Sequence, residues 1–273
     1  MKRNPPDFQV DRAKCLRCGL CIRDCVVKVL RPGDDGVPRM APEDEPFCIR
    51  CRHCFAVCPA GAVSLFGQRP ENARHPSALP EPERMEALIR QRRSIRMYRP
   101  EPLEREILDR LADSHRWSPT GCNDHRLFFR LVDSPAEMAV FRERTADFLK
   151  FLMRTGVMRL VYPKYKRYLS ELTEGSDVIF RSAPHMIVAA SPRSAPCRTA
   201  DPWIALTQFD LLAQSFGVGT CWCGFACYVF RFHRGLRSML GLPSGYRVGA
   251  VLLFGRPAVT YPRVPEPDEV LFP

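Results

Sequence analysis

The chain has 273 residues, with 41 basic and 30 acidic side chains, a formal net charge of +11 and 45% hydrophobic residues. This apolar fraction supports a sizeable core and excludes a largely disordered chain, and the length allows one large domain or two smaller ones. The most apolar stretch, 248–254, is only as long as a strand, so we expect no membrane span. The first seven residues lack the apolar segment of a signal peptide. We therefore expect a soluble, cytoplasmic protein.

Arginine supplies 35 of the 41 basic residues. The arginines are spread along the whole chain, without a lysine-rich tail or alternation with aromatic residues, which disfavours nucleic acid as a partner. One local concentration lies at 84–99, where six arginines accompany a single acidic residue, Glu86. Such a cluster favours a small anionic ligand, such as a phosphate, over a long polyanion.

Eight of the thirteen cysteines fall between Cys15 and Cys58. In a reducing compartment this density indicates metal binding rather than disulfides. The same spacing occurs twice: three cysteines are separated by two residues each, and a fourth follows after three more. The two runs are Cys15-x2-Cys18-x2-Cys21-x3-Cys25 and Cys48-x2-Cys51-x2-Cys54-x3-Cys58-Pro59.

These runs resemble a bacterial ferredoxin with two 4Fe–4S clusters. Three closely spaced cysteines can wrap a short loop around one face of a cubane, and we expect the fourth to begin a helix that points toward the other cluster. The resemblance implies one ligand set of Cys15, Cys18, Cys21 and Cys58, and another of Cys48, Cys51, Cys54 and Cys25.

Structural zinc is the alternative, but a zinc ion takes two Cys-x2-Cys pairs, which triplets followed by a fourth cysteine do not supply. His53 lies between two predicted ligands and is interpreted as a loop residue. Residues 11–52 hold nine basic and seven acidic side chains, so this module lacks an acidic surface and suits a fused electron relay.

A proline-rich segment follows the cysteines. Residues 67–82 contain four prolines and few apolar side chains, which is the composition of a linker. We therefore expect a ferredoxin-like domain at 1–68, a linker at 69–82 and a second domain at 83–273.

The second domain shows the periodicity of mixed secondary structure. Helical spacing of apolar residues appears at 85–89 and 103–111. Ser134 and Glu137 form a capping box with Pro135 at the first helical position, and Asp201-Pro202 opens a further helix that Gly217 ends. The expected strands are 127–132, 185–190 and 248–254. This order, without a regular βαβ repeat, predicts an α+β fold.

Several motifs of the second domain occur in one order. They are RRSIRMY at 92–98, WSPTGCN at 117–123, GVGTCWCGF at 217–225, LGLPSGYRV at 240–248 with FGRP at 254–257, and RVP at 263–265. Together they resemble the flavin-dependent nitroreductase family over nearly all of 84–273. The whole chain resembles a ferredoxin–nitroreductase fusion.

This resemblance implies an α+β domain with a mixed sheet flanked by helices, which forms a homodimer with two FMN molecules at the subunit interface. The residues implied to contact the FMN phosphate and ribityl chain are Arg92, Arg93, Ser94, Arg96 and Arg263. Pro119, Thr120 and Asn123 match a loop that reaches the flavin, although Asp124-His125 stands where the family often has Gln-Pro. Trp222, Cys223 and Gly224 fall where backbone amides face the flavin.

No catalytic side chain is expected, because the flavin carries the chemistry. The segment 145–180, with Tyr162, Tyr165 and Tyr168, matches no motif and is interpreted as a substrate-selecting lid. Cys221, Cys223 and Cys227 have a spacing that suits neither zinc nor a cubane, and we interpret them as small buried hydrophobic residues.

The expected function is that of an oxidoreductase that passes electrons from two 4Fe–4S clusters to FMN, which reduces a nitroaromatic, a quinone or an activated alkene. The electron donor is a one-electron carrier such as reduced ferredoxin, or NAD(P)H. One alternative is an electron relay without an organic substrate. Another is reductive dehalogenation or flavin fragmentation on the same fold. A redox sensor on nucleic acid is disfavoured by the flavin motifs.

Overall fold

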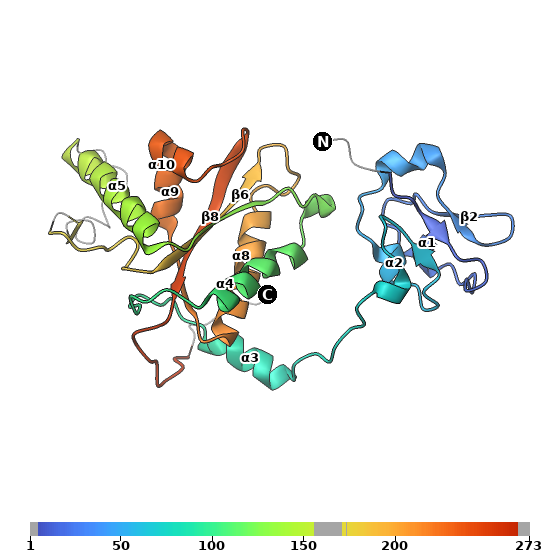
Figure 1. Ribbon diagram of the computed structural model, residues 1–273, viewed down its shortest axis with the longest axis horizontal. Coiled ribbons are helices and arrows are strands. Elements are labelled where there is room, and N and C mark those ends of the chain that lie inside the picture. The colour runs from blue at the N-terminus through green and yellow to red at the C-terminus, as the bar shows by residue number, and fades with distance from the viewer. Residues whose placement is uncertain (1–4, 156–170, 173, 267–273) are drawn as a thin grey trace. The chain divides into compact units, whose positions relative to one another are not determined.

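The structure, a computed structural model, describes residues 5–155, 171–172 and 174–266 (Figure 1). It divides into two compact units. The first runs to Leu79 and includes the segment Cys122–Asp124, and the second takes Pro80–Gly121 and continues from His125. Among the described residues, no helix is both long and apolar enough to cross a membrane.

The first unit is built from very short elements. Among its described residues, two antiparallel strand pairs and four helices of three to six residues make up its regular structure. The strand pairs are β1 (Gln9–Val10) with β4 (Val63–Ser64), and β2 (Arg31–Pro32) with β3 (Pro38–Arg39). The helices are α1 (Leu20–Arg23), η1 (Pro42–Phe47), α2 (His53–Ala56) and η2 (Pro70–Asn72).

The helices α1 and α2 correct one expectation from the sequence. Each contains the third cysteine of its run, Cys21 or Cys54, and ends before the fourth, Cys25 or Cys58. The prediction that the fourth cysteine begins a helix is therefore wrong. The three residues between the third and fourth cysteines complete about one helical turn, so the fourth cysteine can only follow that turn.

The second unit is organised around an antiparallel sheet in the order β5-β6-β8-β7. Its strands are β5 (Phe128–Val132), β6 (His185–Pro192), β7 (Gly219–Trp222) and β8 (Tyr246–Gly255). The strand β6 is buried along its whole length, and β8 from Val248 onward. A parallel pairing joins this sheet at an isolated bridge between Ser94 and Thr220, so the edge beyond β7 is mixed.

Helices cover both faces of this sheet (Figure 1). Side chains alternate between faces along a strand, and Met186 and Val188 of β6 pack in one core cluster while Ile187 and Ala189 pack in another. The first cluster lies under α5 (Pro135–Arg154), α9 (Gly224–Phe232) and α10 (Arg234–Met239). The second lies under α4 (Arg105–Asp113) and α8 (Asp201–Ser215).

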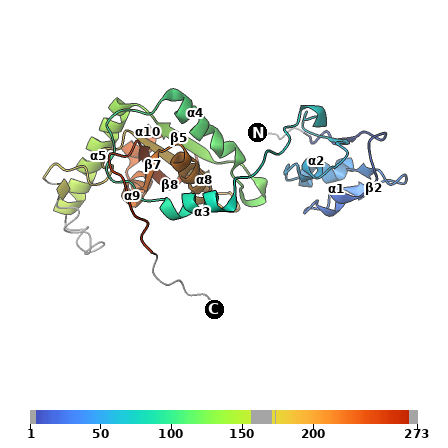
Figure 2. The same cartoon turned by 90° about the horizontal axis from the view of Figure 1, so that it is seen from below.

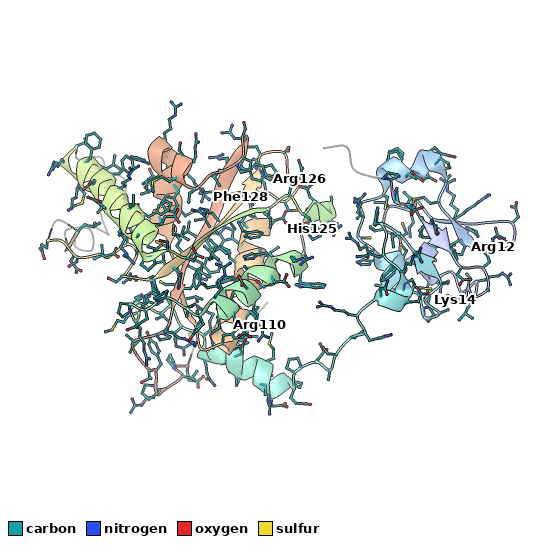
Figure 3. The ribbon with its side chains drawn as sticks, viewed as in Figure 1. Arg12, Lys14, Arg110, His125, Arg126 and Phe128 are labelled. Atoms are coloured by element: carbon teal, nitrogen blue, oxygen red, sulfur yellow. The ribbon has the colours of Figure 1, made fainter. Side chains whose placement is uncertain are left out.

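The remaining elements border the helices of the second core cluster. The helix α3 (Pro82–Gln91) lies beside α8 (Figure 2), and the Gln214 side chain donates to the Leu88 carbonyl at 2.8 Å. Arg110 of α4 lies over the Phe216 ring with its guanidinium carbon 4.6 Å from the centroid (Figure 3). Two 3-10 turns, η3 (Ser114–Trp117) and η4 (Gly121–Asn123), follow α4.

The predicted helices and strands of the second unit are confirmed, and with them the α+β fold. Ser134 caps α5 as predicted, because its hydroxyl accepts from the Glu137 amide at 3.4 Å, whereas the Glu137 carboxylate pairs with Arg130 instead of completing the capping box. The strand β7 was not predicted from the sequence, because its four residues lie inside the motif at 217–225 that was interpreted as a turn typical of the nitroreductase family. Cys221, Cys223 and Cys227 are each 6% exposed, as predicted for small core residues.

Candidate cofactor sites

The first candidate site is a hollow lined by four cysteines. Its walls include Cys15, Cys18 and Cys21 of the first run together with Cys58 of the second. Apolar side chains, among them Val10, complete the wall. The fold therefore brings Cys58 to three thiols that precede it by more than thirty residues, in the combination that the ferredoxin resemblance implies.

The loop around this hollow depends on left-handed backbone. Gly19 has φ of +69° and Arg17 has φ of +54°, the region that lets a short chain turn tightly. The Arg23 guanidinium donates to the Cys18 carbonyl at 2.9 Å and fixes the turn. The Ala62 amide donates to the Cys58 sulfur at 3.2 Å, a contact that would stabilise negative charge on a ligand thiolate.

The second set of cysteines lies in a similar loop. Arg50 and Arg52, on either side of Cys51, have φ of +62° and +61°. Burial raises the pKa of the Cys48 thiol, and the nearby Cys51 and Cys25 add to the rise. Cys25 is thus close to the second run, again in the implied combination.

The two cysteine sets are neighbours. Burial raises the pKa of the Cys54 thiol to about 12, and neighbouring cysteines, Cys21 of the first set among them, add to the rise. Thiols held in such surroundings bind metal as thiolates only when positive charge compensates them. An all-sulfur donor set around an apolar hollow therefore fits iron–sulfur clusters.

The second candidate site is a pocket at the edge of the large sheet. It is lined by Gln91, Arg93, Ile95, Gln214, Gly217, Val218, Gly219, Thr220, Pro257, Tyr261, Pro262, Arg263 and Val264. The segment 92–98 runs along β7 and the end of β8, because the Ile95 amide donates to the Thr220 carbonyl at 2.7 Å and Tyr98 bridges Pro257.

A glycine permits this close approach. A Cβ atom on Gly219 would lie 2.3 Å from Cγ1 of Ile95 and 3.0 Å from Cγ of Pro257. Any other residue at this position would push the arginine segment away from β7. Gly219 thus fixes where the arginines of 92–96 stand.

The charges of three arginines act on the Cys221 thiol. Burial raises the pKa of this thiol, and the charges of Arg181, Arg96 and Arg92 oppose the rise. Arg92 Nη1 lies 3.8 Å from the buried Asp210 carboxylate, too far for a hydrogen bond, and this nitrogen is buried without a hydrogen-bond partner. A buried, unsatisfied guanidinium nitrogen beside two further arginines fits an anionic group such as a phosphate.

Arg93 and Arg263 line the pocket and are not among the three arginines whose charges act on Cys221. The Arg93 guanidinium also donates to the carbonyls of Arg90 and Arg92, at 2.8 and 2.7 Å. It therefore holds the end of α3, where exposed carbonyls attract positive charge. Ser94 forms the parallel bridge to Thr220 and so stands at the sheet edge.

The segment 222–224 joins β7 to α9. The Cys223 amide donates to the Val251 carbonyl at 2.9 Å and its thiol to the Ile179 carbonyl at 3.4 Å. This amide is engaged within the sheet, so it is not available to a flavin. Trp222 stacks on Trp203 with centroids 4.9 Å apart. Among the described residues, apart from its chain neighbours and its own helix backbone, no atom lies within 4 Å of a Cβ placed on Gly224.

The remaining predicted residues lie outside the pocket. Pro119 and Thr120 precede η4, and the Thr120 hydroxyl accepts from the His125 amide at 3.0 Å. Asn123 ends η4 with φ of +53°. Tyr162, Tyr165 and Tyr168 of the predicted lid are outside the described residues.

Two residues beside this arginine cluster, Arg181 and Asp210, were not predicted from the sequence. Arg181 has φ of +56° and belongs to no motif, and Asp210 is a buried carboxylate in the interior of α8, nine residues after Asp201 at its start. The Thr220 hydroxyl donates to Asp210 in a short hydrogen bond. A carboxylate at a buried helical position was the available signal for Asp210, whereas the sequence offered none for Arg181.

Comparison with known proteins identifies the class of both units. The sequence model of the Nitroreductase family matches residues 89–256, and that of the 4Fe-4S dicluster domain matches residues 14–63. The chain belongs to the nitroreductase family and carries a 4Fe–4S dicluster domain ahead of it, as the sequence motifs indicated.

Two curated relatives match a short part of the chain. The methylamine utilization ferredoxin-type protein MauM of Methylobacillus flagellatus is 38% identical over 66 residues, which cover 21% of this chain and 26% of that protein. The chain thus spans about a quarter of the length of the curated relatives it matches.

Solved structures resemble the second unit. An FMN-dependent nitroreductase from Clostridium difficile aligns with a TM-score of 0.56 and 18% identity, over 71% of this chain and 100% of the other. A nitroreductase with bound FMN from Desulfitobacterium hafniense aligns with a TM-score of 0.55 and 24% identity, over 69% and 97%. At these identities the likeness establishes the nitroreductase fold.

Proposed function

We propose that this protein is an oxidoreductase that binds FMN in its second unit and receives electrons through two 4Fe–4S clusters in its first. The observation that carries the proposal is the hollow in which Cys15, Cys18 and Cys21 meet the distant Cys58, in a chain whose residues 89–256 match the nitroreductase family. Cys48, Cys51, Cys54 and Cys25 hold the second cluster in this proposal. Such clusters pass single electrons, and bound FMN collects two for delivery to an organic substrate.

The FMN phosphate is assigned to the arginines of the sheet edge. Arg92 offers a buried nitrogen without a hydrogen-bond partner, Arg96 and Arg181 add positive charge nearby, and Arg263 lines the adjoining pocket. Guanidinium groups bind phosphate through paired charge-assisted hydrogen bonds. Ser94 adds a hydroxyl, and Arg93 positions the segment through the end of α3.

The flavin ring is assigned to the start of α9. The first amides of a helix lack partners within the helix, and the space beside Gly224 is open. The amide of Gly224, the first of α9, is therefore proposed to face the ring together with the amide of Trp222 at the end of β7, while Cys223 supports the turn from within the sheet. Pro119, Thr120 and Asn123 are proposed to contact a flavin across a homodimer interface.

The substrate class follows from this chemistry. We propose reduction of a nitroaromatic, a quinone or an activated alkene, each of which accepts an electron pair from a flavin. We further propose a ferredoxin-like domain at 1–68, a linker at 69–82 and the flavin domain at 83–273.

The test is cofactor analysis of anaerobically purified protein. We expect about eight irons and one FMN per chain. Arg92→Gln should weaken FMN binding about ten- to a hundredfold, the effect of losing one charge-assisted hydrogen bond of about 1.5–3 kcal/mol. Arg84→Gln, an exposed arginine of α3 outside the pocket, is the matched control and should leave FMN affinity unchanged. An unchanged affinity in Arg92→Gln would reject the phosphate assignment.

A further inference from the structure

A second hollow of the nitroreductase unit is lined by arginines and has no assigned role. Its walls contain Arg193, Arg234 and Arg237, the polar side chains of Ser238, Ser244 and Tyr246, and the turn of Leu242, Pro243 and Gly245. None of these lining residues is acidic. We call this feature the arginine hollow.

The frame of the arginine hollow is held by backbone hydrogen bonds. The Arg193 amide donates to the Gly245 carbonyl at 3.0 Å, and the Tyr246 amide donates to the Pro243 carbonyl at 3.1 Å. On the other wall, the His233 ring accepts from the Leu236 amide at 3.0 Å and caps α10. Arg193, which directly follows β6, and the two arginines of α10 therefore project from fixed positions.

These arginines differ from others of the unit in having no counter-charge. Arg105, Arg130 and Arg256 each form an ion pair with a carboxylate. Within the described part of the chain, no carboxylate lies at ion-pair distance from Arg193, Arg234 or Arg237. Arg234 and Arg237 are also three residues apart on one helix, where like charges repel. An anion in the hollow would relieve this repulsion.

The arginine hollow is distant from the proposed flavin pocket. Tyr246 begins β8 and lines the hollow, whereas Gly255 ends β8 and pairs with Gly219 of the flavin pocket. At about 3.4 Å per residue, the two ends of this strand are about 30 Å apart. The FMN phosphate of that pocket cannot also occupy the hollow.

The surroundings of the hollow are basic as well. Arg126 and Phe128 lie at the beginning of β5 (Figure 3), where the Arg126 guanidinium donates to Ser194 at 3.2 Å and the Phe128 ring contacts the Tyr246 ring edge-on at 6.4 Å. The Arg198 guanidinium donates to the Arg193 carbonyl at 3.1 Å. Positive charge thus gathers at this end of the sheet and would attract an anion from solution.

We propose that the arginine hollow is a binding site for a phosphorylated small molecule of the pyrophosphate class, separate from the flavin site. Three guanidinium groups supply paired donors for phosphate oxygens, and the serine and tyrosine hydroxyls add single hydrogen bonds. Three positive charges match the two to three negative charges of a pyrophosphate group better than the single charge of a carboxylate.

Calorimetric titration of the FMN-saturated full-length protein with inorganic pyrophosphate tests this site at about 0.15 M salt. Saturation with FMN keeps the flavin pocket occupied, so the result does not depend on flavin chemistry. We expect saturable binding that weakens at least tenfold in the double variant Arg234→Gln/Arg237→Gln. Both side chains are exposed, so the fold should persist, and Arg193→Gln is a second variant with the same expected direction.

The matched control is Arg105→Gln/Arg116→Gln, which removes the same charge from exposed positions elsewhere in the unit. It should bind pyrophosphate like the unmodified protein. An equal loss in this control would show that net charge alone attracts the anion and would overturn the proposal. Absence of binding to the unmodified protein, or citrate binding as tight as pyrophosphate, would also overturn it, whereas loss of FMN binding in Arg92→Gln would bear on the flavin site alone.

Discussion

Gly219 offers a sharp test of how the fold positions the arginines. In Gly219→Ala the new Cβ would meet Ile95 at 2.3 and 2.9 Å and Pro257 at 3.0 Å. Carbon atoms in contact prefer about 3.5–4 Å, so Ile95 and its neighbours must move outward by about 1 Å. We expect this overpacking to lower the free energy of unfolding by about 1–3 kcal/mol.

The displacement should also reach the flavin site. The Ile95 amide donates a hydrogen bond to the Thr220 carbonyl, and Ser94 and Arg96 are the neighbours of Ile95 in the chain. A shift of that size in the phosphate-binding segment is expected to weaken FMN binding about tenfold, or about 1.4 kcal/mol. Thermal unfolding and titration with FMN, followed by flavin fluorescence, measure the two effects separately.

Gly249→Ala is the matched control for this prediction. Its Cβ would lie 2.4 Å from Cγ of Pro202 in α8, a similar clash that does not involve the arginine segment. It should lower stability to a similar extent and leave FMN affinity unchanged. If both variants weakened FMN binding equally, or Gly219→Ala bound FMN normally, the role assigned to this close approach would be wrong.

Three further predictions concern the clusters, pH and electron entry. Cys58→Ser should reduce iron from about eight to about four per chain, while Cys227→Ser should retain all of it, as measured by iron and sulfide analysis. Burial lowers the pKa of both His115 and His185 to about 4, from 6.5, so the unfolded chain binds more protons below pH 6.5 and stability falls between pH 6.5 and 4. At pH 5 this loss of unfolding free energy is about 2 kcal/mol per histidine. The variant His115→Phe keeps the stacking on Phe129 and should remove about half of the combined loss. Denaturant titrations at pH 7 and pH 5 measure the difference. Deletion of residues 1–68 should retain FMN but abolish turnover with reduced ferredoxin, and full activity of that variant with NADPH, equal to the intact protein's, would show that the clusters are not the route.

The sequence predicted the features that depend on local spacing. Ser134 and Glu137 identified the start of α5 because a capping box uses neighbouring residues. The apolar runs at β6 and β8 identified central strands because both faces are buried. The cysteine runs identified the ferredoxin unit for the same reason, since each cluster loop is contiguous in the chain.

Features that depend on tertiary contacts could not be predicted from local spacing. The engagement of the Cys223 amide with Val251 follows from the pairing of β7 with β8, and β7 is too short to show alternation. Arg181 joins Arg92 and Arg96 only because its segment folds back beside Cys221. The arginine hollow likewise combines the residue after β6, the helix α10 and a turn, none of which carries a phosphate-binding motif.

The strained loops of the first unit bear on how the protein is made in a cell. Arg17, Arg50 and Arg52 hold left-handed backbone that costs about 1 kcal/mol or more per residue, and the core cluster beside them has only four buried members, two of them cysteines. A unit of this size is only marginally stable on its core alone, so bound clusters should add to its folding energy. The amount of intact enzyme should therefore track iron supply, because chains made during iron shortage would expose an unfolded segment to proteolysis.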